Sequence, residues 1–334
     1  MTQNGLEESE KRRASTPRLA SDESPVISSQ EGVIGSSYIG SDPHNLSRAR
    51  ARLESHGIPC VRIEKHLFIK CQSIISPVGP ASEPVDCAPP LCRRLVRELG
   101  GAMVRWTNGF APNNRPAEWY SVICRKFVPL EELPHRKRYK IKRSLKACEA
   151  RIISAGELAA AGYPVLLKAI KRYKGPIPSV PTEEQFRTRL TLDSQFPDLV
   201  QHWGVYHQNT LIGYTQILIV GSMEVGYSTT KLDPAYFKYG PGYAVVYRML
   251  EHYLGRGGYQ YVNDGFRSVY HETNMQSFLM ENFGFEKAYT KLHLYYRSPL
   301  GLLMRLGYPY RNLLGRMDRR LAALFEQERC RRFS

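Results

Sequence analysis

Apolar and β-branched residues are frequent in three consecutive runs near the middle of the chain, at 200–205, 211–220 and 223–231. Short runs of this kind that are rich in Val, Ile, Tyr and Thr predict β-strands. Short polar or glycine-containing turns at 208–209 and 221–222 separate them. The pattern therefore predicts an antiparallel meander of three strands.

Stretches with apolar residues at helical spacing lie on both sides of this meander. Thr182, followed by Glu183 and Glu184, predicts the N-cap and the acidic first turn of one of these helices. Between the last two helices, a β-type run at 259–262 leads into the polar segment 263–265, which we interpret as a loop. The predicted helices cover 155–173, 182–190 and 245–254, and a closing helix carries Asn274 and Ser277 ahead of Gly284 and Phe285.

A second set of elements precedes residue 150 and predicts a smaller N-terminal lobe. Residues 1–43 are rich in Ser, Glu, Arg and Pro and almost lack aromatic residues, so we expect a disordered leader. After Arg297, leucines at interrupted helical spacing alternate with arginines and predict a basic amphipathic tail. The predicted divisions are 1–43, 44–150, 151–297 and 298–334.

The composition narrows the classes of partner. The 334 residues include 47 Lys and Arg against 31 Asp and Glu, which gives a net charge of +16 and favours CoA pyrophosphate, nucleic acid or an anionic membrane surface. The seven cysteines are scattered and lack paired spacing, which argues against a disulfide framework or a zinc site. No apolar run approaches the roughly 20 residues of a membrane span. We therefore expect a cytoplasmic protein, with peripheral contact to the inner face of the membrane as an option, and no metal.

Residues 129–148 form a strongly basic segment with helical periodicity. Apolar side chains recur at helical spacing, and lysines and arginines occupy most other positions. One interpretation is a solvated surface face. The other is a helix that contacts the phosphates of RNA or lines the approach of CoA. The basic residues are Arg136, Lys137, Arg138, Lys140, Lys142, Arg143 and Lys146.

The order of elements over 232–285, strand, Gly-rich turn, helix, strand, polar segment, helix and Gly-Phe, resembles the acyl-CoA-binding half of the GNAT superfamily of N-acyltransferases. With the basic segment at 129–148, the layout resembles the Fem-type branch, whose tandem GNAT-like lobes transfer aminoacyl groups from tRNA. The resemblance implies an α/β (α+β) fold in which a mixed central sheet follows a smaller, degenerate GNAT-like lobe. It also implies N-acyltransferase activity by direct attack of an amine on acyl-CoA, with acetyl as the expected group.

The resemblance also implies where the donor binds. The family's loop, Gln/Arg-x-x-Gly-x-Gly/Ala, matches residues 239–244, but Tyr239 replaces the Gln or Arg and Pro241 removes one N–H donor. A helix start of this kind binds phosphate through unpaired N–H groups and the helix dipole. The residues implied to hold acyl-CoA are Lys238, Tyr239, Gly240, Gly242, Tyr243 and Ala244.

Candidate catalytic residues follow from the same resemblance and from the need for a base and an acid. Glu224 begins the third meander strand, whereas Asp264 and His271 follow the strand at 259–262. Met280 occupies the position where the family often has a Tyr that acts as the general acid. Because Met cannot donate a proton, Tyr270 and Tyr227 are the candidate acids instead. Asn274 belongs to the signature of the closing helix.

The acceptor and the donor stay open at this point. We expect an amine-bearing acceptor, either a small molecule or a cell-envelope or polysaccharide precursor. Aminoacyl-tRNA is the alternative donor, because of the basic segment and the net charge. A third hypothesis is a catalytically silent protein of the same fold that binds RNA or the membrane surface.

Overall fold

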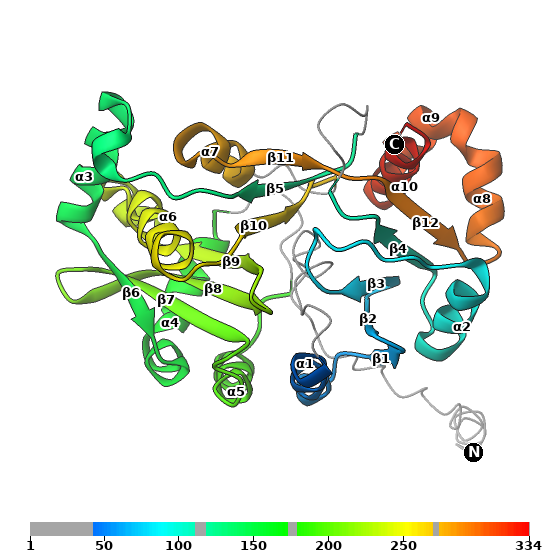
Figure 1. The fold of residues 1–334 in the computed structure, drawn as a ribbon, viewed down its shortest axis with the longest axis horizontal. Helices are drawn as coiled ribbons and strands as arrows, with labels where there is room; N and C mark the ends of the chain where they lie inside the picture. The colour runs from blue at the N-terminus through cyan, green and yellow to red at the C-terminus, as the bar shows by residue number, and fades with distance from the viewer. Residues whose placement is uncertain (1–42, 111–117, 173–178, 270–273, 334) are drawn as a thin grey trace, which may run out of the picture.

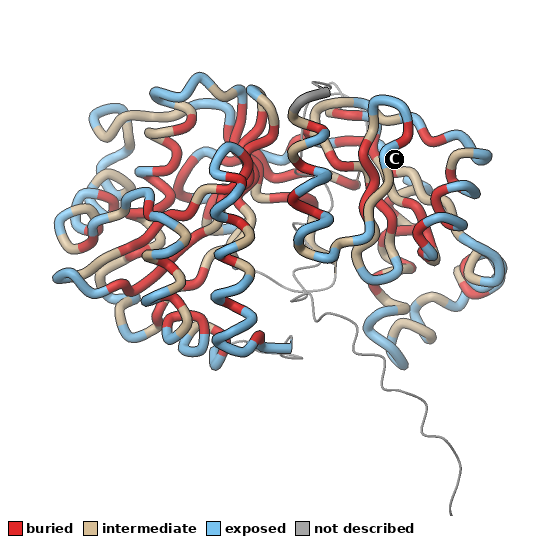
Figure 2. Tube along the Cα trace, turned by 90° about the horizontal axis from the view of Figure 1, so that it is seen from below, coloured by how far each residue is buried: buried red, intermediate tan, exposed pale blue. Residues whose placement is uncertain are grey.

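The computed structural model describes residues 43–110, 118–172, 179–269 and 274–333. These residues form two lobes side by side, each built on one β-sheet (Figure 1). Buried residues follow the strands at the centre of each lobe, and exposed residues lie on the outer helices and loops (Figure 2).

The five-stranded sheet has the order β1-β2-β3-β4-β12. Only its β3–β4 pair is parallel. Helix α2 covers it with a buried stripe of Cys92, Leu95, Val96 and Leu99, the helical spacing that buries one face. The elements are α1 (Pro43–Ser55), β1 (Cys60–Ile63), β2 (His66–Cys71), β3 (Ile74–Val78), α2 (Pro89–Leu99), β4 (Met103–Thr107) and β12 (Leu292–Tyr296).

The seven-stranded sheet has the order β11-β5-β10-β9-β8-β7-β6. Its β9–β10 pair is parallel and its other pairs are antiparallel, so the sheet is mixed, as predicted. The predicted meander is confirmed as β7-β8-β9. The strands are β5 (Tyr120–Cys124), β6 (Glu149–Ile153), β7 (Val200–His207), β8 (Thr210–Val220), β9 (Glu224–Leu232), β10 (Tyr261–Phe266) and β11 (Glu286–Tyr289).

Helices pack on this sheet where the periodicity predicts them. The predicted cap of α5 is confirmed, because Thr182 and Gln185 form a reciprocal capping box. Val245 and Met249 of α6 are fully buried against Ile217 and Val225 of the sheet. The helices are α3 (His135–Ala147), α4 (Ala155–Ile170), α5 (Glu183–Asp193), α6 (Pro241–Leu250), which continues as a π-helical turn at Glu251–Arg256, and α7 (Asn274–Phe283).

The interpretation of residues 263–265 as a loop is wrong. Asn263 pairs with Gly226 of β9, and all three residues belong to β10. The reason is that the Asn263 side chain is buried and hydrogen-bonded inside the sheet, which compensates for its low strand propensity. This correction moves Asp264 from a loop into a strand.

The two lobes exchange one strand each, so that each sheet contains a strand from the other part of the chain. β5 comes from the residues before 150 but lies in the seven-stranded sheet, and β12 follows that sheet in sequence but pairs with β4. The C-terminal helices α8 (Leu300–Gly307), α9 (Arg311–Met317) and α10 (Arg319–Arg332) lie on the side of the five-stranded sheet (Figure 1). Within the part of the chain that the structure describes, no helix is both long and apolar enough to cross a membrane.

Candidate functional site

The parallel strands β9 and β10 separate from each other partway along their length. Their pairing begins at Glu224 and Tyr261 and ends at Gly226 and Asn263. The next residues are Tyr227 on β9 and Asp264 on β10. These two residues therefore mark the point at which the sheet opens, which we call the splay.

Both strands are irregular at the splay. In the pairing of β9 with β8, Tyr227 faces Ile217 and Thr229 faces Gln216, so Ser228 is an extra residue. β10 shifts register against β5 between Asn263 and Phe266. A β-bulge of this kind bends its strand and re-aims side chains, and such bulges are frequent beside active sites.

Tyr227 and Asp264 interact electrostatically at the splay. Tyr227 is 2% exposed, and its hydroxyl has no hydrogen-bond partner among the described residues. Burial raises the pKa of Tyr227; the neighbouring Thr230 and Thr215 side chains lower it, and the nearby Asp264 carboxylate raises it. Burial also raises the pKa of Asp264 well above its ordinary value, because desolvation disfavours the charged form. The splay thus holds a carboxyl group with an elevated pKa beside a protonated phenol.

Glu224 lies at the paired end of the same two strands. It is 0% exposed and accepts hydrogen bonds from the Ala81 N–H (2.7 Å), the Tyr261 hydroxyl (2.7 Å) and the Asn263 amide (2.9 Å). Burial raises its pKa to about 7 despite these bonds. Ala81 follows β3, so this carboxylate joins the two lobes. A catalytic role for Glu224 stays a prediction.

The start of α6 lies next to the splay in sequence and closes the turn that follows β9. Asp233 caps the short 3-10 helix Pro234–Tyr239, and Gly240 adopts a left-handed conformation with φ of 72° before Pro241 begins α6. Only glycine adopts this φ without strain. Pro241 has no N–H, and the Tyr243 N–H donates to the Gly240 carbonyl (2.8 Å), so the positive end of the helix dipole is the main contribution of the α6 backbone to anion binding.

Basic helix α3 packs against the start of α6, as Figure 1 shows. The Ser144 hydroxyl donates to the Gly240 carbonyl (2.6 Å), and Arg143 Nη2 donates to the Lys238 carbonyl (3.4 Å). Lys140 Nζ lies 5.8 Å from the centre of the Tyr243 ring. The exposed side chains of Lys140, Arg143 and Lys238 therefore surround a helix start that is already positive.

The aromatic residues of the predicted donor loop are engaged in packing. Tyr239 stacks on His207 with ring centres 4.1 Å apart, and the Tyr243 hydroxyl lies 3.3 Å from Asn282 Oδ1. Ala244 is fully buried. A methyl group on Gly242 would meet Leu232 and Phe278 at 3.6 Å, which is ordinary contact. Among the predicted donor residues, Lys238 and the α6 backbone thus keep the most direct access to a phosphate.

The remaining predicted catalytic residues flank α7. Tyr270 and His271 lie outside the residues that the structure describes. Asn274 is the exposed first residue of α7. Gln276, two residues further, donates to the Phe266 carbonyl (3.1 Å) and interacts with the Asp264 carboxyl, which places α7 over the splay.

A cavity of about 220 Å³ lies between the lobes and was not found by sequence reasoning. Lys65 and Arg105 supply cationic groups and Glu83 a carboxyl group to its lining, and the buried Trp119 indole N–H has no hydrogen-bond partner among the described residues. Phe266 connects the cavity to the splay, because it lies two residues after Asp264 on β10. The lining comes from several separate segments, so no local motif could have revealed it.

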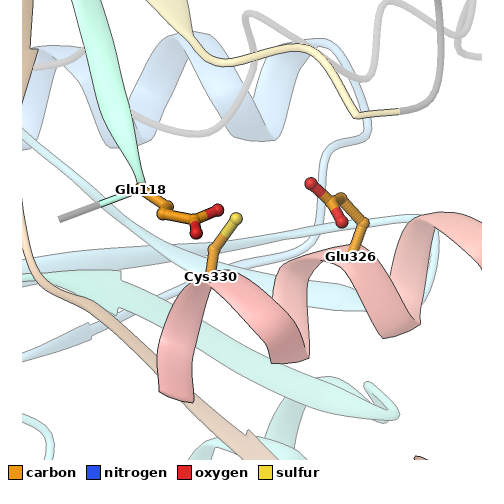
Figure 3. A group of neighbouring side chains, drawn as sticks. All are labelled: Glu118, Glu326 and Cys330. Carbon is orange, nitrogen blue, oxygen red and sulfur yellow. The ribbon is translucent and has the colours of Figure 1, made fainter. Parts of the chain in front are cut away.

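Glu118, Glu326 and Cys330 converge near the start of β5 and form a group that could be mistaken for a metal site (Figure 3). Arg329 pairs with both carboxylates, and Arg267 Nη2 lies 2.7 Å from Glu326 Oε1. Two guanidinium groups therefore already neutralise the two carboxylates. We interpret the cluster as an ion-pair network that fastens α10 to the seven-stranded sheet.

No protein-family model and no curated protein sequence matches this chain. Among solved structures, FemX is similar with 10% identity and a TM-score of 0.51, over 78% of this chain and 94% of FemX. A protein of unknown function from Bacteroides thetaiotaomicron (12% identity, TM-score 0.47, 73% of this chain and 87% of that one) also matches. A tandem GNAT protein from the clavulanic acid biosynthesis pathway matches with 12% identity and a TM-score of 0.41, over 72% of this chain and 82% of that one. The similarity to FemX shows the fold: the chain has a GNAT-like fold in the Fem-type layout.

Proposed function

We propose that this protein is a cytoplasmic N-acyltransferase that moves an acyl group through the splay, from a phosphate-bearing donor to an amine. The observation that carries the proposal is the opening of β9 and β10 at Tyr227 and Asp264, beside the cationic start of α6. A reactive carboxyl group, a proton donor and a phosphate site are the parts that such a transfer needs.

Acyl-CoA is the donor that we propose first. Its pyrophosphate would bind the backbone at the start of α6 and the side chains of Lys140, Arg143 and Lys238. A fixed phosphate would hold the thioester near the splay, because positioning supplies much of the rate enhancement in a two-substrate reaction.

Asp264 and Tyr227 would then perform the proton transfers. The amine nitrogen attacks the thioester carbonyl carbon, and Asp264, as a carboxylate, accepts the proton that the nitrogen loses. The new C–N bond replaces the C–S bond, and Tyr227 donates a proton to the departing thiolate. An elevated pKa suits Asp264 to this role, because a general base works best when its pKa lies near the working pH. Tyr270 is the alternative acid.

The interlobe cavity is the proposed site of the acceptor. Lys65 and Arg105 favour an anionic group on the acceptor, and the Glu83 carboxyl group in the same lining favours its amine. The Trp119 indole would donate to a polar atom of the same ligand, which would satisfy a donor that is otherwise buried without a partner. Small amines and cell-envelope or polysaccharide precursors both fit this description.

Aminoacyl-tRNA is the second candidate donor, and the exposure of α3 favours it. Lys140, Arg143 and the exposed residues Arg136, Lys142 and Lys146 form a longer cationic surface than one pyrophosphate requires. A polynucleotide that contacts several of these residues would bind with a steep dependence on salt, whereas CoA would show a shallow one.

The test is thermal stabilisation of the full chain by acetyl-CoA, CoA and bulk tRNA at low and moderate salt. A ligand that binds only the native state raises the melting temperature. A shift with acetyl-CoA that survives moderate salt supports the first donor. A shift with tRNA alone that disappears with salt supports the second. No shift with any of them contradicts the proposal and favours a protein without transferase activity.

A pair of matched double variants locates the donor. Lys140→Glu with Arg143→Glu should abolish the shift, because both side chains lie at the start of α6. Arg93→Glu with Arg97→Glu reverses the same number of exposed charges on α2 in the other lobe and should leave the shift unchanged. Equal loss in both pairs would show that net charge, and not this site, governs donor binding.

A further inference from the structure

Helices α8 and α9, with the 3-10 turn Tyr308–Tyr310 between them, expose six large apolar side chains in a short stretch of the chain. Their exposed fractions range from 44% for Leu303 to 77% for Met317. Exposed apolar residues scattered one by one are ordinary, but a contiguous set usually marks an interaction surface. We call Leu302, Leu303, Leu306, Tyr310, Leu313 and Met317 the apolar face.

The inner sides of the same helices are already packed. Met304 is 2% exposed, and a methyl group on Gly307 would lie 3.1 Å from the Phe325 ring of α10. Gly315 of α9 is similarly close to Ala322 of α10. These contacts fix α8 and α9 against α10 through their small inner residues. The apolar face is therefore the outward side of a packed substructure.

Cationic residues are placed beside the apolar face by a repeated pattern. Leu302, Arg305 and Leu306 recur as Leu313, Arg316 and Met317 in α9. Residues three and four apart share one side of a helix, so each pattern sets one exposed arginine next to two exposed apolar side chains.

The surroundings of the apolar face are almost free of acid. Residues 300–320 contain five arginines and one acidic residue, Asp318. Asp318 caps α10 by accepting from the N–H groups of Arg320 and Leu321. Neither Arg305 nor Arg316 forms an ion pair with another described residue. Two copies of this surface would repel each other, whereas an anionic partner would be attracted.

We propose that the apolar face binds the surface of an anionic phospholipid bilayer. Leucine, tyrosine and methionine side chains would enter the boundary between headgroups and acyl chains, and the arginines would contact lipid phosphates, as in interfacial amphipathic helices. Helices α8 and α9 lie at one end of the molecule, and α3 and β6 lie at the other (Figure 1). Membrane binding therefore leaves α3 and the start of α6 accessible to a donor.

The experiment is co-sedimentation of the full chain with vesicles of phosphatidylcholine alone or mixed with phosphatidylglycerol, without donor or acceptor. Binding should require the anionic lipid. Leu306→Glu with Leu313→Glu should weaken it at least about tenfold, because charged side chains cannot enter the acyl boundary. Arg305→Glu with Arg316→Glu should weaken it roughly tenfold as well.

Ile152→Glu is the matched control, since Ile152 is an exposed apolar residue on β6 at the far edge of the other sheet. It should bind vesicles like the wild type. Three results would overturn the proposal: no binding by the wild type, loss of binding only in Lys140→Glu with Arg143→Glu, or a dimer in light scattering that Leu306→Glu with Leu313→Glu dissociates. Vesicle binding that appears only after removal of residues 1–42 would also overturn it, since that segment would then be the occupant.

Discussion

Each end of the β9–β10 pair carries a carboxyl group, but the two carboxyl groups differ in their hydrogen bonding. Glu224, at the paired end, is a buried carboxyl whose oxygens accept three hydrogen bonds. Asp264, at the splay, is a carboxyl with a raised pKa that faces a phenol without a hydrogen-bond partner among the described residues. Burial raises the pKa of both groups, so an elevated pKa alone does not identify the reactive one.

The hydrogen-bond partners of the two carboxyl groups suggest different roles. Glu224 accepts hydrogen bonds from its own lobe and from Ala81 of the neighbouring lobe, and it would lose bonds that join the lobes if it took a proton from a substrate. Asp264 lies where the sheet opens, and the Gln276 side chain of α7 interacts with it there. We therefore propose that Glu224 holds the two lobes together and that Asp264 takes part in the chemistry. Separate variants of the two residues test each role.

Asp264→Asn should have the largest effect. The amide cannot accept the amine proton, so kcat should fall on the order of a thousandfold, the scale of a lost general base. The change also replaces an acid whose charged form is disfavoured by burial, so stability should not decrease. CoA release with pooled amines would measure kcat, and urea unfolding would measure stability. Wild-type turnover would remove Asp264 from the mechanism.

Glu224→Leu should mainly destabilise the fold. It leaves the Ala81 N–H, the Tyr261 hydroxyl and the Asn263 amide without their acceptor, which costs on the order of 3 kcal/mol or more of unfolding free energy. Glu224→Gln is the control, because its amide keeps one acceptor oxygen and should lose less. A stable Glu224→Gln variant with strongly reduced turnover would show instead that Glu224 takes part in the chemistry.

The pH dependence of stability offers a third test of the same residue. The pKa of Glu224 is raised from 4.5 to about 7 on folding, so between these values the folded state binds more protons than the unfolded state. Stability should therefore fall as pH rises from about 4.5 to 7, by at most about 3 kcal/mol. Urea unfolding across this range would measure the fall, and Glu224→Gln should reduce it. An unchanged fall would assign it to other groups.

The strands and helices around the splay could be predicted from the sequence, but the strand segment 263–265 at the splay could not. Runs rich in Val, Ile, Tyr and Thr and bounded by turn residues identify β8 and β9, and Thr182 identifies the start of α5 through its capping chemistry. The segment 263–265 looked like a turn because Asn, Asp and Gly disfavour strands. The buried hydrogen-bond partners of the Asn263 side chain, Glu224 and Ser121, explain why this segment is a strand.

The candidate site was predictable to the extent that it is local. The Gly240-Pro241 helix start could be read from adjacent residues, and Pro is favoured in a first turn. Its proximity to α3 depends on a hydrogen bond between Ser144 and Gly240, which are 96 residues apart. The bulge at Ser228 and the interlobe cavity likewise depend on pairing and packing between distant segments, for which a single sequence carries no periodic signal.

Tyr227→Phe should have the smallest effect on turnover and stability. It tests most directly whether the splay and the paired end of the strands differ in function. The lost hydroxyl has no hydrogen-bond partner among the described residues, so the unfolding free energy should change by less than about 1 kcal/mol. If Tyr227 protonates the leaving thiolate, kcat should nevertheless fall roughly tenfold, with donor affinity unchanged. Tyr261→Phe is the matched control, because that hydroxyl donates to Glu224 at the paired end and its loss should reduce stability more than turnover. Unchanged turnover in Tyr227→Phe would transfer the role of the acid to Tyr270, whereas equal losses of stability in both variants would mean that the two ends of the strand pair do not differ in function.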